Sequence, residues 1–303
     1  MSDGDDLAQL LTLRDWLRYA VSRFNAAGLV YGHGSARAID EAAYLVLHTL
    51  HLPIDELEPW LECRLLLSER RALQEIIEAR IETRKSAPYL TKQAWVQGHS
   101  FYVDERVIVP RSYIGELLAG DLEGIAGDPG GIGRVLDLCT GSGCLAVLAA
   151  LRFAGAKVDA TDISSDALSV AAKNVQDYGL EHRIALVQSD LFAALADRRY
   201  DLILSNPPYV DSEAVSAFPP EYAADPRLAH WGGEDGLDLV RKILTEAARH
   251  LTPRGMLLVE IGRGRELLES EFPELPFLWF DTAESVGEVF SISRPDLETI
   301  QGR

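Results

Sequence analysis

Four consecutive residues rich in hydrogen-bond acceptors follow one apolar segment of the chain. Asn206, Pro207, Pro208 and Tyr209 come directly after residues 200–205. Proline fixes its own φ and has no N–H, so this loop offers carbonyl oxygens without competing donors, and the Asn206 side chain adds another acceptor. Two neighbouring acceptors suit a planar NH2 group, on which the Tyr209 face can pack. The tetrapeptide predicts a pocket for an amide or an exocyclic amine; a plain Pro-Pro turn is the alternative.

A second loop, built from small residues, follows the apolar segment 134–138. Gly141 and Gly143 let the backbone approach a ligand before a helix begins near Cys144. This spacing also fits a nicotinamide dinucleotide site. The carboxylate of Asp137 favours a different ligand, because it would repel a pyrophosphate and attract a molecule that carries an ammonium and a sulfonium.

Acidic residues end three further apolar segments. Asp162 stands where a carboxylate would accept hydrogen bonds from a ribose diol, although it could also cap a helix over 164–178, and both roles can hold. Residues 189–192 are expected to flank an adenine, with Asp190 accepting from its amino group; an ordinary turn is the alternative. Glu260 ends a strand on the ligand side, where proximity to the site is left open.

The elements that must position these loops alternate strands and helices, as in a parallel sheet covered on both faces. The last two strands lack an intervening helix, so the closing pair is predicted to be antiparallel. The predicted strands are 134–138, 157–161, 183–188, 201–205, 256–261, 277–281 and 288–293.

The first third of the chain has a different pattern. Apolar residues at helical spacing predict helices over 7–27, 36–50 and 68–83, the last capped by Ser68. Alternation then predicts a hairpin that turns at Gly98-His99, and a Gly-rich loop over 124–133 precedes the first strand of the sheet.

Composition limits the class of protein. With 303 residues, 47% of them hydrophobic, the chain can bury a large core in two domains. Its net charge of -18 argues against nucleic acid or an anionic membrane as the main partner and fits a basic protein, although acidity also simply keeps enzymes soluble.

Three cysteines without CxxC spacing predict a reducing compartment and no metal site. Residues 1–6 are acidic and do not resemble a secretion signal, and no apolar run is long enough to span a bilayer. We therefore expect a soluble, cytoplasmic protein.

The site motifs together resemble the class I methyltransferases that use S-adenosylmethionine, in particular the HemK/Prm family of protein-glutamine N-methyltransferases. The residues that carry this resemblance are 137–143, Asp162, 189–190 and 206–209. It spans essentially the whole chain and implies an α/β fold, in which a seven-stranded Rossmann-like sheet with its last strand antiparallel follows a small helical domain and a β-hairpin linker.

The domain boundaries implied by the resemblance are 1–90 for a helical substrate-recognition domain, 91–115 for the linker and 116–303 for the methyltransferase domain. One branch of the family acts on peptide chain release factors and has Pro-Arg-Pro-Glu-Thr-Glu after the hairpin. Here residues 111–114 read Arg-Ser-Tyr-Ile, which is similar to the branch that acts on the third protein of the large ribosomal subunit. In many members of that branch a proline stands in place of Tyr113.

The resemblance also implies roles for individual residues, with no metal. Asn206, Pro207 and Tyr209 would be catalytic, and together with Pro208 they would form the pocket for the substrate glutamine, supported by Arg111. Leu191 stands where the release-factor branch often has Trp. The residues expected to bind S-adenosylmethionine, and its product S-adenosylhomocysteine, are Asp137, Leu138, Cys139, Thr140, Gly141, Gly143, Asp162, Asp190, Leu191 and Asn206.

The resulting hypothesis is methyl transfer from S-adenosylmethionine to the side-chain amide nitrogen of a glutamine in ribosomal protein L-three. Glutamine methylation of release factors is the nearest alternative. Methylation of the DNA adenine amino group is another, because Asn-Pro-Pro-Tyr also occurs in enzymes that act on that amine. The alternative that is not an enzyme is an assembly factor that binds the cofactor but transfers no methyl group.

Overall fold

The computed structural model describes residues 7–32, 34–120, 125 and 129–300. Its internal contacts divide the chain into two compact units, one running to Gln93 and including Phe218–Ala224, the other made of Ala94–Ala217 and the residues from Asp225 onward. The predicted boundaries at residues 90 and 115 stay a prediction. The acidic N-terminal residues 1–6, and residues 124 and 126–128 of the loop predicted over 124–133, lie outside the described part of the chain.

The first unit is helical, as predicted, but two helix starts differ from the prediction. The helix predicted over 7–27 is interrupted after residue 7, and α2 begins at Leu13, because Thr12 and Asp15 form a capping box there. Ser68 is not a cap: it lies inside its helix, and the Glu69 carboxylate accepts from the Leu66 N–H at 2.7 Å. The elements are α2 (Leu13–Ala26), α3 (Ala38–Thr49), η1 (Glu58–Trp60), α4 (Leu67–Thr83) and α5 (Ala87–Thr91).

The helices of this unit pack around Trp16, Phe24 and Leu45. A buried ion pair crosses the packing, since Arg80 Nε lies 2.6 Å from Glu41 Oε1 with both side chains almost fully enclosed. Such a pair holds specific partners together, because removing either one leaves a buried charge without compensation.

A distant piece of the chain completes the helical unit. Phe218–Ala224, which contains the short helix η3 (Pro220–Ala224), belongs to it by its contacts. The buried carboxylate of Glu221 accepts from the Arg84 guanidinium at 2.6 Å and from the Val30 N–H at 3.1 Å.

The second unit begins with the predicted hairpin. Strands β1 (Gln93–Val96) and β2 (His99–Tyr102) are joined at Gln97 and Gly98, which have φ of 50° and 75°. Two positive φ values suit the twist of a two-residue hairpin turn. The turn therefore lies one residue earlier than predicted, and His99 is the first residue of β2.

A seven-stranded sheet forms the centre of the second unit, as predicted. Its order is β5-β4-β3-β6-β7-β9-β8, and β9 runs antiparallel to both of its neighbours. The antiparallel closing pair is confirmed. The strands are β3 (Arg134–Leu138), β4 (Lys157–Asp162), β5 (Ile184–Gln188), β6 (Tyr200–Ser205), β7 (Leu251–Glu260), β8 (Leu278–Asp281) and β9 (Val286–Ser293).

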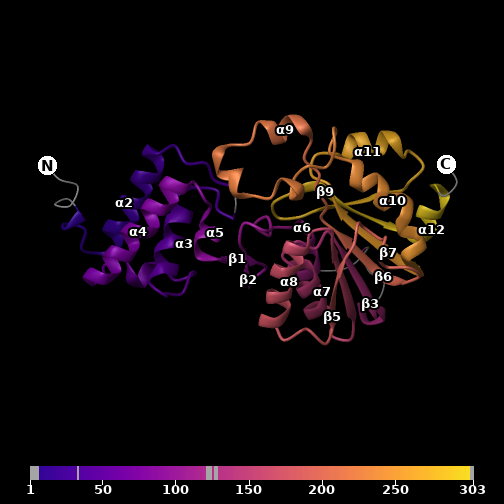
Figure 1. The fold of residues 1–303 in the computed structure, drawn as a ribbon, viewed down its shortest axis with the longest axis horizontal. Helices are drawn as coiled ribbons and strands as arrows, with labels where there is room; N and C mark the ends of the chain where they lie inside the picture. Colours follow the sequence, from indigo (N-terminus) through magenta and orange to yellow (C-terminus); the bar gives the residue numbers. More distant parts are fainter. Residues whose placement is uncertain (1–6, 33, 121–124, 126–128, 301–303) are drawn as a thin grey trace. The chain divides into compact units, whose positions relative to one another are not determined.

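Helices cover both faces of this sheet (Figure 1). On one face, α6 (Tyr113–Ala119), α7 (Cys144–Arg152) and α8 (Ser165–Asp177) pack with the hairpin on the strand side chains that include Val135. On the other, α10 (Asp238–His250), α11 (Arg265–Glu271) and α12 (Arg294–Leu297) pack on those that include Leu136. Successive strand residues point to opposite faces, so each strand contributes to both layers. Shorter elements are η2 (Pro129–Gly131), α9 (Ser212–Ser216), η4 (Arg227–Ala229) and η5 (Glu298–Ile300).

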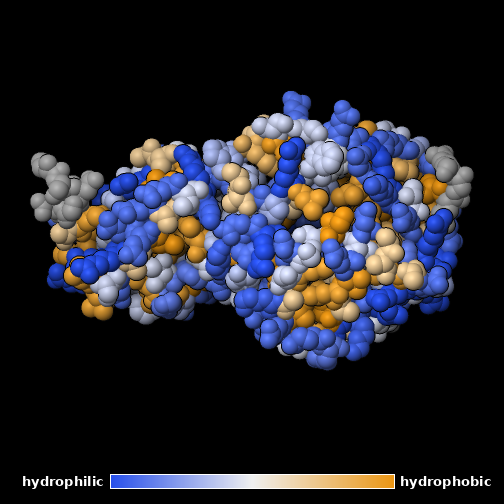
Figure 2. Space-filling view, viewed as in Figure 1, coloured by the Kyte–Doolittle hydropathy of each residue, from blue (hydrophilic) through white to orange (hydrophobic). Residues whose placement is uncertain are grey.

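Hydrophilic residues cover much of the face shown in Figure 2, and hydrophobic residues gather there in separate patches. Within the described ranges, no helix combines the length and the apolar character needed to cross a bilayer.

Candidate active site

The two loops with predicted chemistry begin side by side at one edge of the sheet. β3 and β6 are parallel neighbours with Leu138 opposite Ser205, and Ser205 Oγ donates a hydrogen bond to the Leu138 carbonyl at 3.2 Å. Because β3 pairs with β4 on its other side, the strand order reverses between β3 and β6. Open α/β sheets bind ligands in the crevice at such a reversal.

The loop after β3 turns sharply into α7. Cys139, Gly141 and Gly143 all have left-handed backbone, with φ of 58°, 55° and 79°. A Cβ at Gly143 would lie 3.0 Å from the Ala171 Cβ, so this position packs against α8, whereas a Cβ at Gly141 would meet nothing within 4 Å. The Thr140 N–H donates to the Thr161 carbonyl at 2.9 Å and anchors the loop to β4. Its open side is therefore at Gly141, where a ligand can approach the backbone.

Asp137 is a fully buried carboxylate beneath this loop. Its Oδ2 accepts from Thr140 Oγ1 at 2.5 Å and from the Ala146 N–H at 3.0 Å. Its Oδ1 is buried and receives no hydrogen bond from the described residues. Burial raises the pKa of Asp137 to about 7, although both hydrogen bonds oppose the shift. A buried acceptor with unused capacity fits a ligand that brings a donor or a positive charge.

Asp162, at the end of β4, is tied to the same loop. Its two oxygens accept from the Gly141 N–H and the Ser164 N–H, each at 2.9 Å. The cap of α8 is Ser164, so Asp162 is not the N-cap itself. Burial raises the pKa of Asp162.

The loop after β5 forms a compact turn. Ser189 Oγ donates to the Leu191 carbonyl at 2.7 Å and accepts from the Ala194 N–H, and the Ser189 N–H donates to the Asp162 carbonyl at 3.0 Å. Asp190 is exposed, whereas Leu191 is buried and has a φ of 45°. The turn that was the alternative interpretation is present, and it places the Asp190 carboxylate at the edge of the sheet that carries Asp137 and Asp162.

The acceptor loop, residues 206–209, follows β6. Asn206 is half-buried, and its Nδ2 donates to the Arg111 carbonyl at 3.4 Å. This contact uses the donor side of the amide, so Oδ1 remains its acceptor side. Arg111 was predicted to support the pocket, and its backbone carbonyl makes this contact; its side chain is exposed.

Tyr209 is held at both ends. Its hydroxyl donates to Glu260 Oε1 at 3.2 Å, while the edge of its ring lies where a Cβ at Gly262 would approach to 2.8 Å. Burial, followed by the charge of Glu260, raises the pKa of Tyr209 well above its usual range, so the phenol keeps its proton as a donor. Arg111 opposes that shift.

Glycines from two later segments cradle the acceptor loop. A Cβ at Gly232 would come within 2.5 Å of the Pro208 carbonyl oxygen, and one at Gly236 would collide with the Tyr209 carbonyl oxygen. The Val210 N–H donates to the His230 carbonyl, and the Gly232 N–H donates back to the Val210 carbonyl, both at 2.9 Å. This role was not predicted, and its signal in the sequence is the group of three glycines, Gly232, Gly233 and Gly236, before α10.

Glu260 also proves to be part of this region. It ends β7, is 2% exposed, and accepts from Ser112 Oγ at 2.6 Å and from the Tyr113 N–H at 2.9 Å in addition to Tyr209. Burial raises the pKa of Glu260 to about 7, against the lowering effect of these hydrogen bonds. Glu260 therefore lies next to Tyr209 of the acceptor loop, a proximity that the sequence alone left open.

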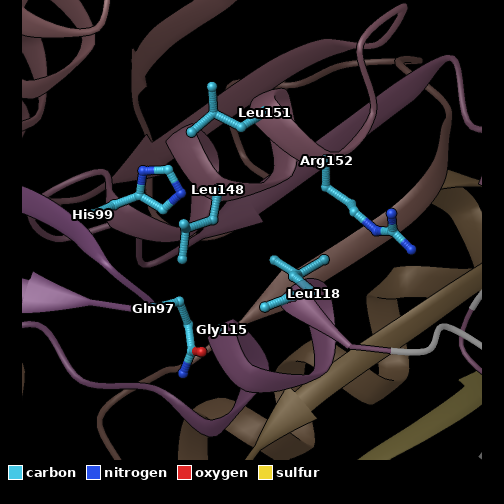
Figure 3. Close-up of a pocket in the computed structure, with 8 residues that line it drawn as sticks. Gln97, His99, Gly115, Leu118, Leu148, Leu151 and Arg152 are labelled. Carbon is cyan, nitrogen blue, oxygen red and sulfur yellow. The ribbon is translucent and has the colours of Figure 1, made fainter.

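A separate hollow lies elsewhere on this unit. It has a volume of about 220 Å³ and lies between Gln97 and His99 of the hairpin, Leu118 of α6, and Leu148 and Arg152 of α7 (Figure 3). None of the residues predicted to bind cofactor or substrate lines it.

The strand order, the glycine loop after β3 and the acceptor loop after β6 define a class I methyltransferase. Residues 118–218 match the family model of the methyltransferase small domain. The catalytic domain of hMettl16 has a similar fold, with a TM-score of 0.51 and 16% identity over 77% of this chain and 85% of that one.

Much closer relatives carry the name ribosomal protein uL3 glutamine methyltransferase. The one from Bradyrhizobium diazoefficiens is 54% identical over 96% of this chain and 93% of its own. Those from Bordetella pertussis and Neisseria gonorrhoeae are both 53% identical, over 96% and 95% of this chain and 98% and 96% of their own. The chain belongs to the family of ribosomal protein uL3 glutamine methyltransferases.

Proposed function

We propose that this methyltransferase transfers a methyl group from S-adenosylmethionine to the side-chain amide nitrogen of a glutamine in ribosomal protein uL3. One observation supports the proposal: the Asn206 Nδ2 donates to the Arg111 carbonyl at 3.4 Å, which leaves Oδ1 to act, together with the Pro207 carbonyl, as an acceptor for the substrate at the reversal of strand order. An amide NH2 has the two donors that such a pair requires.

The residues around the glycine loop fit the proposed cofactor. The buried Oδ1 of Asp137, which has no hydrogen-bond partner in the described part of the chain, suits a positively charged donor, and the open side of Gly141 gives access to the backbone. Asp162, Asp190 and Leu191 would hold the nucleoside. When bound, S-adenosylmethionine supplies a methyl group made electrophilic by the sulfonium. The remaining residues proposed to contact it are Leu138, Cys139, Thr140, Gly143 and Asn206.

An amide nitrogen is a poor nucleophile because its lone pair is delocalised into the carbonyl, so positioning must supply most of the rate. Asn206 Oδ1 and the Pro207 carbonyl would accept both N–H groups and turn the nitrogen toward the methyl, in a geometry close to attack. The same acceptors stabilise the positive charge that grows on nitrogen. Pro208 and the face of Tyr209 would complete the pocket. The methylated nitrogen is acidic enough to lose its proton to water, so no strong base is needed.

The acidic character of the chain supports a basic protein as substrate. Its net charge is -18, whereas proteins that bind ribosomal RNA carry clusters of Lys and Arg. Such complementarity speeds association, and we expect the association rate with uL3 to fall as ionic strength rises. We assign substrate recognition to the helical region, residues 1–90, and the reaction to the cytoplasm.

The test offers labelled S-adenosylmethionine with purified uL3, the other large-subunit proteins and release factors, and locates the methyl group by mass spectrometry. We expect label on a glutamine side chain of uL3. Label on a release factor instead, on adenine in added DNA, or on no acceptor at all would overturn the proposal, and each of these outcomes would identify a different activity.

A further inference from the structure

One buried carboxylate takes no part in the steps above. Glu260 lies at the end of β7 and joins two segments that are distant in sequence. Its Oε2 accepts from Ser112 Oγ at 2.6 Å and from the Tyr113 N–H at 2.9 Å, across 148 and 147 residues. Its Oε1 accepts from the Tyr209 hydroxyl at 3.2 Å, across 51 residues. A single side chain therefore connects the start of α6 to the acceptor loop.

The segment that Glu260 holds also orients Asn206. Arg111 directly precedes Ser112, and its carbonyl accepts from the Asn206 Nδ2 at 3.4 Å. Ser112 is the N-cap of α6, with its Oγ accepting from the Ile114 N–H at 3.2 Å, so the position of this segment is fixed by both the helix and Glu260. Displacement of Ser112 would move the carbonyl that sets the orientation of the Asn206 amide.

We propose that Glu260 is a positioning residue for methyl transfer, which as a carboxylate holds Tyr209 and residues 111–113 so that Asn206 Oδ1 faces the substrate amide. This inference rests on the proposed function. Glu260 acts through Tyr209 and Ser112 and does not itself touch the reacting atoms.

The chemistry of the three partners explains why a carboxylate fits this position. The Ser112 hydroxyl, the Tyr113 N–H and the Tyr209 hydroxyl all donate to Glu260. An ionised carboxylate only accepts, so it can serve all three. A protonated carboxyl or a glutamine amide presents a donor on one side, so the Tyr209 hydroxyl would have to turn and accept from it, which changes how Tyr209 is held.

The charge state of Glu260 should therefore appear in the pH dependence of turnover. Burial raises the pKa of Glu260 to about 7. The other ionisable groups that act at this point are Tyr209, Tyr113, Arg111, Glu288 and Cys144. Burial raises the pKa of both tyrosines and of Cys144 above ordinary values that already lie above 7, so the pKa shifts of these three groups move them away from neutral pH, whereas that of Glu260 moves it toward neutral pH.

The experiment measures kcat for uL3 methylation against pH at saturating cofactor in the wild-type protein and in Glu260→Gln. We expect the wild-type kcat to rise through a midpoint near pH 7 and the variant to have a kcat lower by about ten- to a hundredfold, without that midpoint. The affinity for S-adenosylhomocysteine should stay unchanged. Glu266→Gln makes the same chemical change at an exposed position on α11 and serves as the matched control.

Two further variants separate positioning from folding. Ser112→Ala removes a hydrogen bond that lowers the pKa of Glu260, so the midpoint should move to higher pH, a shift that a purely structural role would not produce. In a Tyr209→Phe background, Glu260→Gln should lower kcat by a smaller factor than in the wild type, because one of the bonds it disturbs is already absent.

The outcomes are distinguishable. If wild-type protein transfers no methyl group to uL3, the proposed function fails. If wild-type protein is active while Glu260→Gln keeps the wild-type kcat and midpoint, the inference about Glu260 fails. Should Glu260→Gln not fold, as judged by thermal unfolding, the Ser112→Ala midpoint decides, and an unshifted midpoint rejects the inference.

Discussion

The glycine loop after β3 and the acceptor loop after β6 start from neighbouring strands, yet each rests on a buried carboxylate of a different kind. Beneath the glycine loop, Asp137 uses one oxygen for two donors and leaves the other without a partner among the described residues. Beside the acceptor loop, Glu260 engages both oxygens with three donors from the chain. Burial raises the pKa of each to about 7. A buried carboxylate that retains a free acceptor, such as Asp137, is suited to a ligand. One whose two oxygens are both engaged by the chain, such as Glu260, is suited to positioning.

The backbones of the two loops differ in the same sense. The glycine loop has an open position, because a Cβ at Gly141 would meet no atom within 4 Å. The acceptor loop is enclosed, since Gly232 and Gly262 lie so close to Pro208 and Tyr209 that neither could carry a side chain without displacement. One loop is shaped to admit a molecule, and the other is shaped to hold its own acceptors still.

The largest effect that separates the loops is expected from Asn206→Ala. The change removes one acceptor of the substrate amide, and loss of one such preorganised group costs about 10² to 10³ in rate. We expect kcat for uL3 methylation to be nearly abolished while the affinity for S-adenosylmethionine, measured by calorimetry, stays within a few-fold of wild type. Asn25→Ala, at an exposed position on α2, is the control. Retained methyl transfer would remove Asn206 from the catalytic assignment.

Asp137→Asn should have the complementary effect. An asparagine can still accept from Thr140 and Ala146, but its NH2 would then occupy the side of the unpaired oxygen and oppose a cationic donor. A hydrogen bond to a charged group contributes about 1.5–3 kcal/mol. We therefore expect cofactor affinity to fall by about ten- to a hundredfold, with kcat at saturating cofactor close to wild type. Asp166→Asn, on the exposed face of α8, is the control. A loss confined to kcat would contradict the assignment of Asp137 to the cofactor.

A smaller effect is expected from Gly262→Ala. The added methyl would approach the Tyr209 ring to 2.8 Å at a φ of 55°, and overpacking of this kind costs about 1–3 kcal/mol. The temperature of thermal unfolding and kcat should both decrease. Gly179→Ala is the matched control, because Gly179 also has a positive φ, 64°, and its Cβ would meet nothing within 4 Å. Equal behaviour of the two variants would show that the acceptor loop is not held rigidly by its glycines.

The smallest expected effect is a pH dependence of stability shared by the two carboxylates. Their pKa values rise from 3.8 and 4.5 to about 7 on folding, so the stability they contribute is complete below about pH 4 and is lost as pH rises through 7. His48 and His250 have lowered pKa values and act in the opposite sense. Chemical denaturation should therefore show Asp137→Asn and Glu260→Gln gaining stability relative to wild type between about pH 5 and 8. A constant difference across that range would contradict the raised pKa values.

The positions of the strands and of the polar residues that end them were predictable. A strand buried on both faces is a nearly continuous apolar run, and the first polar residues after it mark the edge where ligands bind. For this reason Asp162 and Asn206 were placed at the correct edge of the sheet. The segment from Val135 to Leu138 is buried throughout, and the strand Arg134–Leu138 matched the prediction residue by residue.

The contacts of Glu260 could not be predicted, because its partners lie 51, 147 and 148 residues away and no local pattern reports such distances. The cradle at Gly232 and Gly262 was hidden for the same reason. Errors at helix starts had a local cause: whether Ser68 or Glu69 satisfies the first free N–H depends on side-chain conformation, which residue type alone does not determine.

The attachment of Phe218–Ala224 to the helical unit limits how this protein can be dissected. A fragment that stopped at residue 93 would keep Arg84 and the Val30 N–H but lose the Glu221 carboxylate that both of them contact. Conversely, a truncation that removed only residues 1–93 would leave Glu221 without the Arg84 guanidinium and the Val30 N–H that it contacts. The helical unit is therefore discontinuous along the chain, and producing it alone would require residues 218–224 to be grafted onto it.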